Sequence, residues 1–268
     1  MGVHMDSNLS RVRDKILRGE LVIGSHVATS DPVTSEIISA VGFDFVWIDW
    51  EHGALDRKDI NLHIMAVRGQ GAAPFVRVPW NDPVLVKPIL DMGPAAVVFP
   101  FVKTAAEAEQ AVASCRYPPD GVRGFAPIRA IGYGTMEVQD YLDRARTEPW
   151  VIVQIEQIDA VEHVEEIIAV EGIDTIVIGA SDLSGSMGLL SEVRHPSVME
   201  VLDHIADICN RAGFPFGASL LWSEDNVRDW IRRGVNWIGV DNDVSYLING
   251  ARGTYEATRN LAAKLGRK

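Results

Sequence analysis

Short apolar runs alternate with stretches of helical spacing along most of the chain. The runs that predict strands are LVIGSHV, FDFVWID, APFVRV, AAVVFP, VIVQI, DTIVIG, FPFGASL and NWIGV. They are continuous apolar runs, which is typical of parallel strands that are covered on both faces. A helical pattern follows each run, so parallel pairing with right-handed crossovers is expected. Eight such units predict a closed (β/α)8 TIM barrel.

Several predicted helices have clear start and stop signals. One begins at Asp31-Pro32 and ends at Gly42, because an acid is a good N-cap, proline suits the first turn and glycine suits the end. The same signals place a helix between Asp82-Pro83 and Gly93. Other helices are predicted at residues 10–18, after Asp56, from Thr104, and at 159–170, 197–212, 223–234 and 244–263. Residues 117–134 and the segment after Asp182 are expected to be loops.

One domain is expected to span residues 1–268, because a barrel of this kind needs about 250 residues. No linker or low-complexity tract divides the pattern. Residues 1–8, which open MGVHM, are interpreted as a tag or a disordered segment. No GxGxxG motif follows the first strand, which argues against a dinucleotide-binding sheet.

The composition narrows the class of protein. A net charge of -12 makes the chain a poor candidate for nucleic-acid binding. No apolar run is long enough for a membrane span, and no signal peptide is visible. Cys115 and Cys209 have no metal-ligand spacing, so a reducing, cytoplasmic location is expected.

Polar residues stand at the ends of four predicted strands. They are Asp49, His52, Arg77, Gln154, Glu156 and Asp182. In a parallel barrel all strand C-termini open onto one face, where the active sites of such enzymes lie. We therefore expect these residues to converge at a common mouth.

Glu156 and Asp182 are 26 residues apart, about one βα unit, so neighbouring strands should present them. Two carboxylates without cysteine or histidine at ligand spacing favour a hard divalent cation, namely Mg²⁺, Mn²⁺ or Co²⁺. Gln154 precedes Glu156 on the same strand end, which supports a binding site. The alternative is that both acids are helix N-caps.

His52 and Arg77 are the candidate acid–base and electrostatic groups. Asp49 lies three residues before His52, and a nearby carboxylate can raise the basicity of an imidazole. Arg77 interrupts an apolar strand, so its guanidinium must face the mouth, where it can stabilise an oxyanion. The alternatives are a loop histidine paired with Glu51 and a barrel arginine paired with an acid. His26 shows no partner in the sequence and is interpreted as structural or solvent-facing.

Together these motifs resemble the HpcH/HpaI family of metal-dependent class II pyruvate aldolases. The resemblance rests on GFDFVWIDWEHG, VRVPWNDP, ILDMG, RYPPDGVRG, VQIE and IGASDLSGSMG in that order. It implies a modified (β/α)8 barrel whose swapped or protruding C-terminal helix packs on a neighbouring subunit, in a hexamer built as a dimer of trimers. It also implies cleavage of 4-hydroxy-2-oxo acids to pyruvate and an aldehyde, or the reverse condensation.

The resemblance also implies a role for each site residue. His52 is the base, Asp49 is its close partner, Asp91 raises its basicity, and Arg77 stabilises the enolate. Glu156 and Asp182 bind the metal, while Gln154 and Ser181 contact the pyruvoyl part. Trp50 stands where many relatives have a small residue, and Ala180-Ser181 where many have Pro-Ala. These two departures bear on the acceptor pocket, so Trp50 is predicted either to contact the substrate or to pack.

The sequence therefore predicts a metal-dependent aldolase. Two alternatives stay open. One is an oxaloacetate decarboxylase that uses the same enolate chemistry, and the other is a non-catalytic barrel that acts as a binding protein. The residues do not identify the aldehyde, the physiological metal or the role of residues 116–134.

Overall fold

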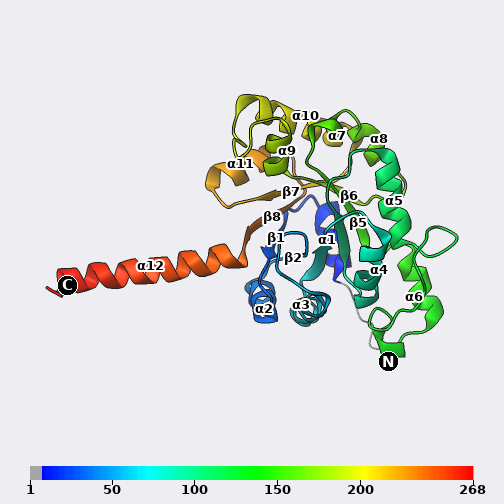
Figure 1. Ribbon diagram of the computed structural model, residues 1–268, viewed down its shortest axis with the longest axis horizontal. Coiled ribbons are helices and arrows are strands. Elements are labelled where there is room, and N and C mark those ends of the chain that lie inside the picture. The colour runs from blue at the N-terminus through cyan, green and yellow to red at the C-terminus, as the bar shows by residue number, and fades with distance from the viewer. Residues whose placement is uncertain (1–7, 268) are drawn as a thin grey trace.

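A closed parallel barrel forms the body of the protein (Figure 1). The computed structural model describes residues 8–267. The strands are β1 (Val22–Val27), β2 (Phe45–Asp49), β3 (Ala73–Arg77), β4 (Ala96–Phe99), β5 (Trp150–Ile155), β6 (Thr175–Ile178), β7 (Phe216–Leu220) and β8 (Trp237–Asn242). Each strand pairs with its neighbour in sequence, and β8 closes the barrel by pairing with β1. The predicted (β/α)8 fold is confirmed.

Helices surround the barrel, and their bounds largely follow the predicted caps. They are α1 (Leu9–Leu17), α2 (Pro32–Val41), α3 (Arg57–Gln70), α4 (Pro83–Met92), α5 (Ala105–Cys115), α6 (Val138–Ala145), α7 (Ile158–Val161), α8 (Val164–Ile168), α9 (Ala180–Ser186), α10 (Pro196–Ala212), α11 (Glu224–Arg232) and α12 (Asp243–Lys264). The side chains of Asp31, Asp56, Asp82 and Thr104 all accept N-cap hydrogen bonds from the first turns of their helices. These caps satisfy backbone N–H groups that have no partner inside the helix.

Four segments differ from the expected elements, and one of them is α6, a helix that was not predicted. The helix expected at 159–170 is broken into α7 and α8, which are separated at Glu162 and His163. A short helix, α9, begins directly after β6 where a loop was expected. Residues 117–134 are mainly irregular as predicted but end in a short 3₁₀ turn, η1 (Gly132–Gly134), before α6. Asn8, within the segment interpreted as a tag, donates from its side chain to the carbonyl of Ala72 at 2.8 Å; residues 1–7 lie outside the described residues.

Aromatic side chains fill the inside of the barrel. Phe45 and Phe75 stack with their ring centroids 4.6 Å apart, and Trp237 meets both rings edge-on. Gly217 makes room for this indole, because a Cβ at that position would lie 2.1 Å from the ring of Trp237. Successive strand residues point to opposite faces, so the residue two positions beyond each of these inward side chains also faces inward. Near the carboxyl ends of the strands this inward row changes from apolar to polar.

The two terminal helices lie at different places. Leu9 and Val12 of α1 are buried in the same cluster as the inward-facing aromatic residues. In contrast, α12 projects away from the barrel as a long arm (Figure 1). Only its first residue, Asp243, is buried among the described residues of this helix. The predicted protruding C-terminal helix is therefore present.

Candidate active site at the barrel mouth

An arginine and two carboxylates are joined at the ends of β2 and β3. Nε and Nη2 of Arg77 donate to the two carboxylate oxygens of Asp49 at 3.0 and 2.6 Å. Nη1 of the same guanidinium lies 2.9 Å from an oxygen of Glu51. The Glu51 oxygen makes no hydrogen bond in this geometry, so the pair with Asp49 uses two of the five N–H groups of the guanidinium and leaves others for an acceptor at the mouth. Arg77 was interpreted either as a group that faces the mouth or as a barrel arginine paired with an acid. In the structure it lies at the mouth and is also paired with an acid.

The two carboxyls differ in their proton affinity. Burial favours the protonated form of Asp49, but the charge and hydrogen bonds of Arg77 hold its pKa below the usual value. In Glu51 burial outweighs the attraction of Arg77 and raises the pKa. Repulsion from Asp49 and Asp182 adds to this rise. Asp49 is therefore the permanent counter-ion of Arg77, and Glu51 is the more easily protonated neighbour.

His52 is the open group of the site. Its side chain is 65% exposed, and its Nε2 lies 4.0 Å from the Glu51 carboxylate. The carboxylate of Asp49 accepts from the backbone N–H of His52 at 3.3 Å. Asp49 thus fixes the turn that carries His52 and does not bond to its ring. An exposed imidazole beside the mouth has the mobility and access that a proton-transfer group needs.

Glu156 is held at the end of β5, two strands from Arg77 in the barrel order. One of its oxygens accepts from the backbone N–H of Phe101 at 2.8 Å, and the other accepts from Nε2 of Gln154. Phe101 has a φ of 56°, a left-handed conformation that non-glycine residues adopt infrequently. A Cβ at Gly179 would lie 2.9 Å from both Gln154 and Glu156. The backbone at the start of α9 can therefore approach Glu156 closely only because residue 179 is glycine.

Other acids lie near Glu156. Burial, with repulsion from Glu51 and Asp182, raises the pKa of Glu156 to about 8 against the opposing bond from Phe101 and the charge of Arg77. Asp182 lies half-buried in the first turn of α9. No cluster of three or more histidine, cysteine or acidic side chains suited to a metal is found within residues 8–267. The arrangement fits a divalent cation that takes two protein carboxylates and fills its other positions from water and substrate.

The other predicted site residues have different surroundings. Asp91 pairs with Arg123 at 3.3 Å, and no hydrogen bond or ion pair joins it to His52 in the described part of the chain. Gln154 donates from Nε2 to Glu156, and its buried Oε1 has no hydrogen-bond partner among the described residues. Ser181 is exposed in α9. The ring of Trp50 packs against the core outside the barrel, which favours the packing interpretation of this residue.

The arginine-rich segment is tied to the protein body. Arg116, Arg123 and Arg129 are all buried. Arg116 donates to the carbonyl of Pro149, and Arg129 donates to that of Met92. Arg123 also donates to Tyr141 at 2.9 Å. These contacts favour the structural interpretation of the segment over substrate binding.

Two residues at the mouth were not identified from the sequence. His26, interpreted as lacking partners, is bonded through Nδ1 to the carbonyl of Asp241 at 2.9 Å and through Nε2 to Ser219 at 3.1 Å. Its ring also lies 4.9 Å from that of Trp47. Burial lowers the pKa of His26 to about 4 against the opposing bond from Asp241. No local motif marks this group, because its members come from β1, β7 and β8.

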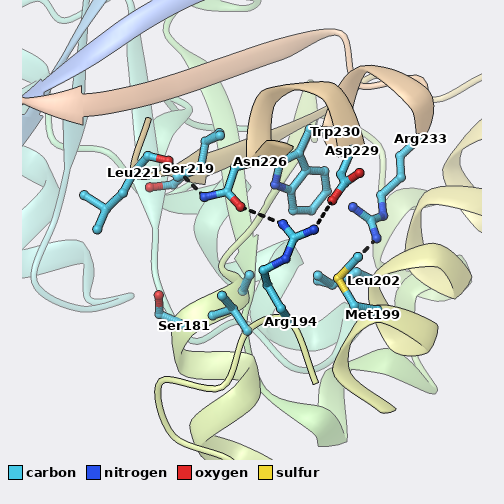
Figure 2. A pocket seen from close by; sticks show the side chains of 13 residues that line it. Ser181, Arg194, Met199, Leu202, Ser219, Leu221, Asn226, Asp229, Trp230 and Arg233 are labelled. Atoms are coloured by element: carbon cyan, nitrogen blue, oxygen red, sulfur yellow. Dashed lines mark hydrogen bonds and ion pairs between the residues drawn. The ribbon is translucent and has the colours of Figure 1, made fainter. Parts of the chain in front are cut away.

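A separate cavity of about 130 Å³ adjoins the mouth between α9, α10, β7 and α11. Figure 2 shows Ser181 and Ser219 at one side of it and Arg194 pointing toward Asn226 and Asp229. Arg194 bonds to both of these residues at 3.0 and 2.9 Å. The Arg194 guanidinium is thus already paired, and Arg77, His52 and Glu156 do not line this cavity.

Comparison with known proteins agrees with this geometry. The HpcH/HpaI aldolase/citrate lyase family model matches residues 23–250. The 5-keto-4-deoxy-D-glucarate aldolase of Shigella boydii serotype 18 (strain CDC 3083-94 / BS512) is 38% identical over 226 residues, which are 84% of this chain and 87% of that protein. None of the helices in residues 8–267 combines the length and apolar character that a membrane span requires.

Solved structures share the architecture. An HpcH/HpaI aldolase/citrate lyase family protein from Burkholderia cenocepacia J2315 is 32% identical with a TM-score of 0.87, and the match covers 94% of this chain and 99% of that one. A citrate lyase beta subunit from M. tuberculosis, solved with oxaloacetate and magnesium, has a TM-score of 0.55 at 15% identity, with 84% and 92% of the two chains covered. The latter shows the fold. The motifs, the mouth residues and the extent of these matches establish that the chain belongs to the HpcH/HpaI aldolase/citrate lyase family and is an enzyme of the class II pyruvate aldolase type.

Proposed function

We propose that this aldolase cleaves 4-hydroxy-2-oxo acids to pyruvate and an aldehyde, and runs the reverse condensation, with a divalent cation held by Glu156 and Asp182. The observation that carries the proposal is the placement of Asp182, in the first turn of α9, beside the buried carboxyl of Glu156, whose pKa is raised to about 8 by burial and by repulsion from Glu51 and Asp182. A bound cation relieves that repulsion. Mg²⁺, Mn²⁺ and Co²⁺ suit the oxygen donors, and such an ion supplies Lewis acidity and a template for a chelating 2-oxo acid.

Arg77 stabilises the charge that develops on the substrate. Two of its N–H groups bond to Asp49, and N–H groups left free by this pair donate to the keto oxygen as it becomes an enolate oxygen. Because the guanidinium is already fixed, it needs no reorganisation when the charge forms. Gln154 and Ser181 contact the pyruvoyl part, where the amide NH₂ of Gln154, which also donates to Glu156, is the group able to donate to a carboxylate or keto oxygen.

His52 carries the proton in the cleavage direction. It removes the proton of the C4 hydroxyl, the C3–C4 bond breaks, the aldehyde leaves, and the electron pair remains on the 2-oxo fragment as an enolate. Protonation of that enolate at C3 gives pyruvate. Asp49 positions the turn that bears His52. A role for Asp91 in raising the basicity of His52 requires Asp91 to change partner, because its carboxylate is paired with Arg123.

Metal removal tests the proposal directly. The protein is treated with a chelator, and pyruvate release from a 4-hydroxy-2-oxo acid is followed before and after Mg²⁺, Mn²⁺ or Co²⁺ is restored. Activity should disappear and return with the ion. Full activity in the metal-free protein, with covalent trapping of pyruvate by borohydride, would indicate a lysine Schiff base and contradict the proposal.

Oxaloacetate decarboxylation is a second candidate, since it passes through the same enolate and needs no aldehyde. Oxaloacetate turnover without any aldol activity would favour it as the main function. A binding protein without catalysis would show neither reaction. The arrangement of Arg77, His52, Glu156 and Asp182 around one mouth supports the catalytic candidates.

We also propose that the protein assembles as a homo-oligomer, a hexamer made of two trimers, through its C-terminal arm. Apolar side chains on α12 are exposed with respect to the rest of residues 8–267; they are Val244, Tyr246, Leu247, Ile248, Tyr255 and Leu261. A surface of this kind is expected to be buried against another protein. Light scattering should give a mass several times that of one chain, and Leu247→Asp with Ile248→Asp should lower it. A monomeric wild-type protein would contradict the assembly.

A further inference from the structure

His26 and Ser219 belong to the inward-facing row of the barrel mouth. Each lies two residues beyond a glycine whose Cβ would enter an inward aromatic ring, Gly24 against Phe45 and Gly217 against Trp237. By the same alternation, His26 and Ser219 point into the barrel. Both are half-buried, so they border the space that the substrate occupies. In barrel order they lie on the β7–β1 side of the mouth, away from Glu156 at the end of β5.

The hydrogen bonds around His26 determine where each proton lies. The carbonyl of Asp241 only accepts, so Nδ1 of His26, 2.9 Å away, is the protonated nitrogen. The neutral ring then has a lone pair on Nε2, and the Ser219 hydroxyl, 3.1 Å away, donates its one proton there. The outward side of the Ser219 oxygen is left with lone pairs. Ser219 therefore presents a hydrogen-bond acceptor to the mouth.

This arrangement is preorganised. Asp241 has a φ of 56°, a left-handed conformation that serves to aim its carbonyl at His26. Trp47 supports one side of the imidazole, with ring centroids 4.9 Å apart. Gly239 leaves the ring its space, because a Cβ there would lie 2.8 Å from Cε1 of His26. Ser219 also lines the cavity shown in Figure 2, so unfilled volume adjoins it.

We propose that Ser219, oriented by His26, selects the aldehyde by accepting a hydrogen bond from a hydroxyl group on the acceptor part of the substrate. The proposal rests on the aldolase function proposed above, in which the pyruvoyl end lies toward β5 and β6 and the C4 hydroxyl lies toward His52. Carbons beyond C4 then extend toward β1 and β7. A fixed acceptor favours a hydroxyl there, gains nothing from a hydrocarbon group and repels a carboxylate.

Matched aldehydes test this selectivity. Glycolaldehyde and acetaldehyde differ by one hydroxyl, and glyoxylate places a carboxylate at the corresponding position. The value of kcat/KM for addition to pyruvate is measured for each with the metal-loaded enzyme. Ser219→Ala should lower the glycolaldehyde-to-acetaldehyde ratio roughly 3- to 10-fold, the range for one uncharged hydrogen bond. Ser114→Ala, which removes a buried hydroxyl bonded within α5, should leave the ratio unchanged.

His26→Phe gives a second, opposite-signed readout. The Ser219 proton is then free to turn toward the substrate, so glyoxylate should improve relative to acetaldehyde. An unchanged ratio in both variants, or equal losses for all three aldehydes, overturns the selectivity proposal. Exchange of the pyruvate methyl protons with deuterated water needs no aldehyde and reports on the enolate step alone. Absence of that exchange in the wild-type enzyme would instead mean that the proposed aldolase function has failed.

Discussion

The middle and the mouth of the barrel are built from the same strands but differ in the side chains that point inward, which are apolar in the middle and charged at the mouth. On β3, the inward residue Phe75 is fully packed among aromatic rings, whereas Arg77, the next inward residue, is surrounded by charged groups. The middle buries apolar surface and contributes stability. The mouth concentrates acids, and burial together with repulsion from Glu51 and Asp182 raises the pKa of Glu156 there. A step of two residues along a strand thus separates the part that holds the fold from the part that does chemistry.

Glu156 is the residue whose substitution is expected to have the most different effects on activity and on stability. Glu156→Gln removes one of the two proposed metal ligands, and aldol activity should fall at least about a thousandfold, the equivalent of several kcal/mol. The same change removes a buried carboxylate that Glu51 and Asp182 disfavour. The metal-free variant should therefore unfold at a higher temperature than the metal-free wild type. Calorimetry measures the unfolding temperature, and a pyruvate-release assay measures the activity. A variant that loses both stability and activity would contradict this prediction.

Phe75 should show the reverse behaviour. Phe75→Ala removes a ring stacked on Phe45 at 4.6 Å and should lower the free energy of unfolding by about 3–5 kcal/mol. Denaturant titration measures this change. The fraction that remains folded should keep the wild-type KM for the oxo acid, because no reacting group has been altered. Phe75→Leu leaves a smaller void and provides a milder companion if the alanine variant does not fold.

Substitution of Arg77 should lower both the activity and the stability of the protein. Arg77→Ala removes a donor to the developing oxyanion, so kcat should fall about 10²–10³-fold. It also leaves the buried carboxylates of Asp49 and Glu51 without a counter-ion, which destabilises the fold. Arg77→Lys keeps the charge but loses the planar fork, so it should recover more stability than activity. If kcat falls less than about tenfold in the alanine variant, the oxyanion role is wrong.

The smallest effect is expected in the pH dependence of stability, through His26. Its folded-state pKa of about 4 lies below the ordinary value of 6.5, so the unfolded chain binds a proton in this window that the native state does not. Stability should therefore fall as the pH drops from 6.5 toward 4. In His26→Phe the unfolding free energy should depend less steeply on pH over this range, by up to about one proton. Denaturation curves of the wild type and of His26→Phe at several pH values measure this slope. An unchanged slope in the variant would mean that His26 is more solvated in the folded protein.

Much of the fold could be predicted because its signals are local. Each strand is a continuous apolar run, and the caps at Asp31, Asp56 and Asp82 mark their helices by adjacent residues. The short helix α9 escaped prediction because it contains serine and glycine, which are weak helix formers. The break between α7 and α8 has no proline or glycine to announce it.

The same distinction between local and distant signals applies to the residues of the site. Asp49, His52, Arg77, Glu156 and Asp182 were identifiable because each follows an apolar strand and a parallel barrel gathers strand ends. The partners of His26 were not identifiable, since they lie 193 and 215 residues away and come together only through barrel closure. The pairing of Asp91 with Arg123 was equally invisible, because Arg123 lies in an irregular segment whose path the sequence pattern does not define.

Closure of the barrel by β1 and β8 has a consequence for biosynthesis. β1 is among the first strands to leave the ribosome, yet its edge stays unpaired until Trp237–Asn242 has been translated. Exposed strand edges promote association with other chains, and pairings distant in sequence form slowly. The His26 end of the mouth can therefore be completed only after β8 has been translated. A nascent chain that already contains Arg77 and Glu156 still lacks β8, the strand that pairs with the open edge of β1.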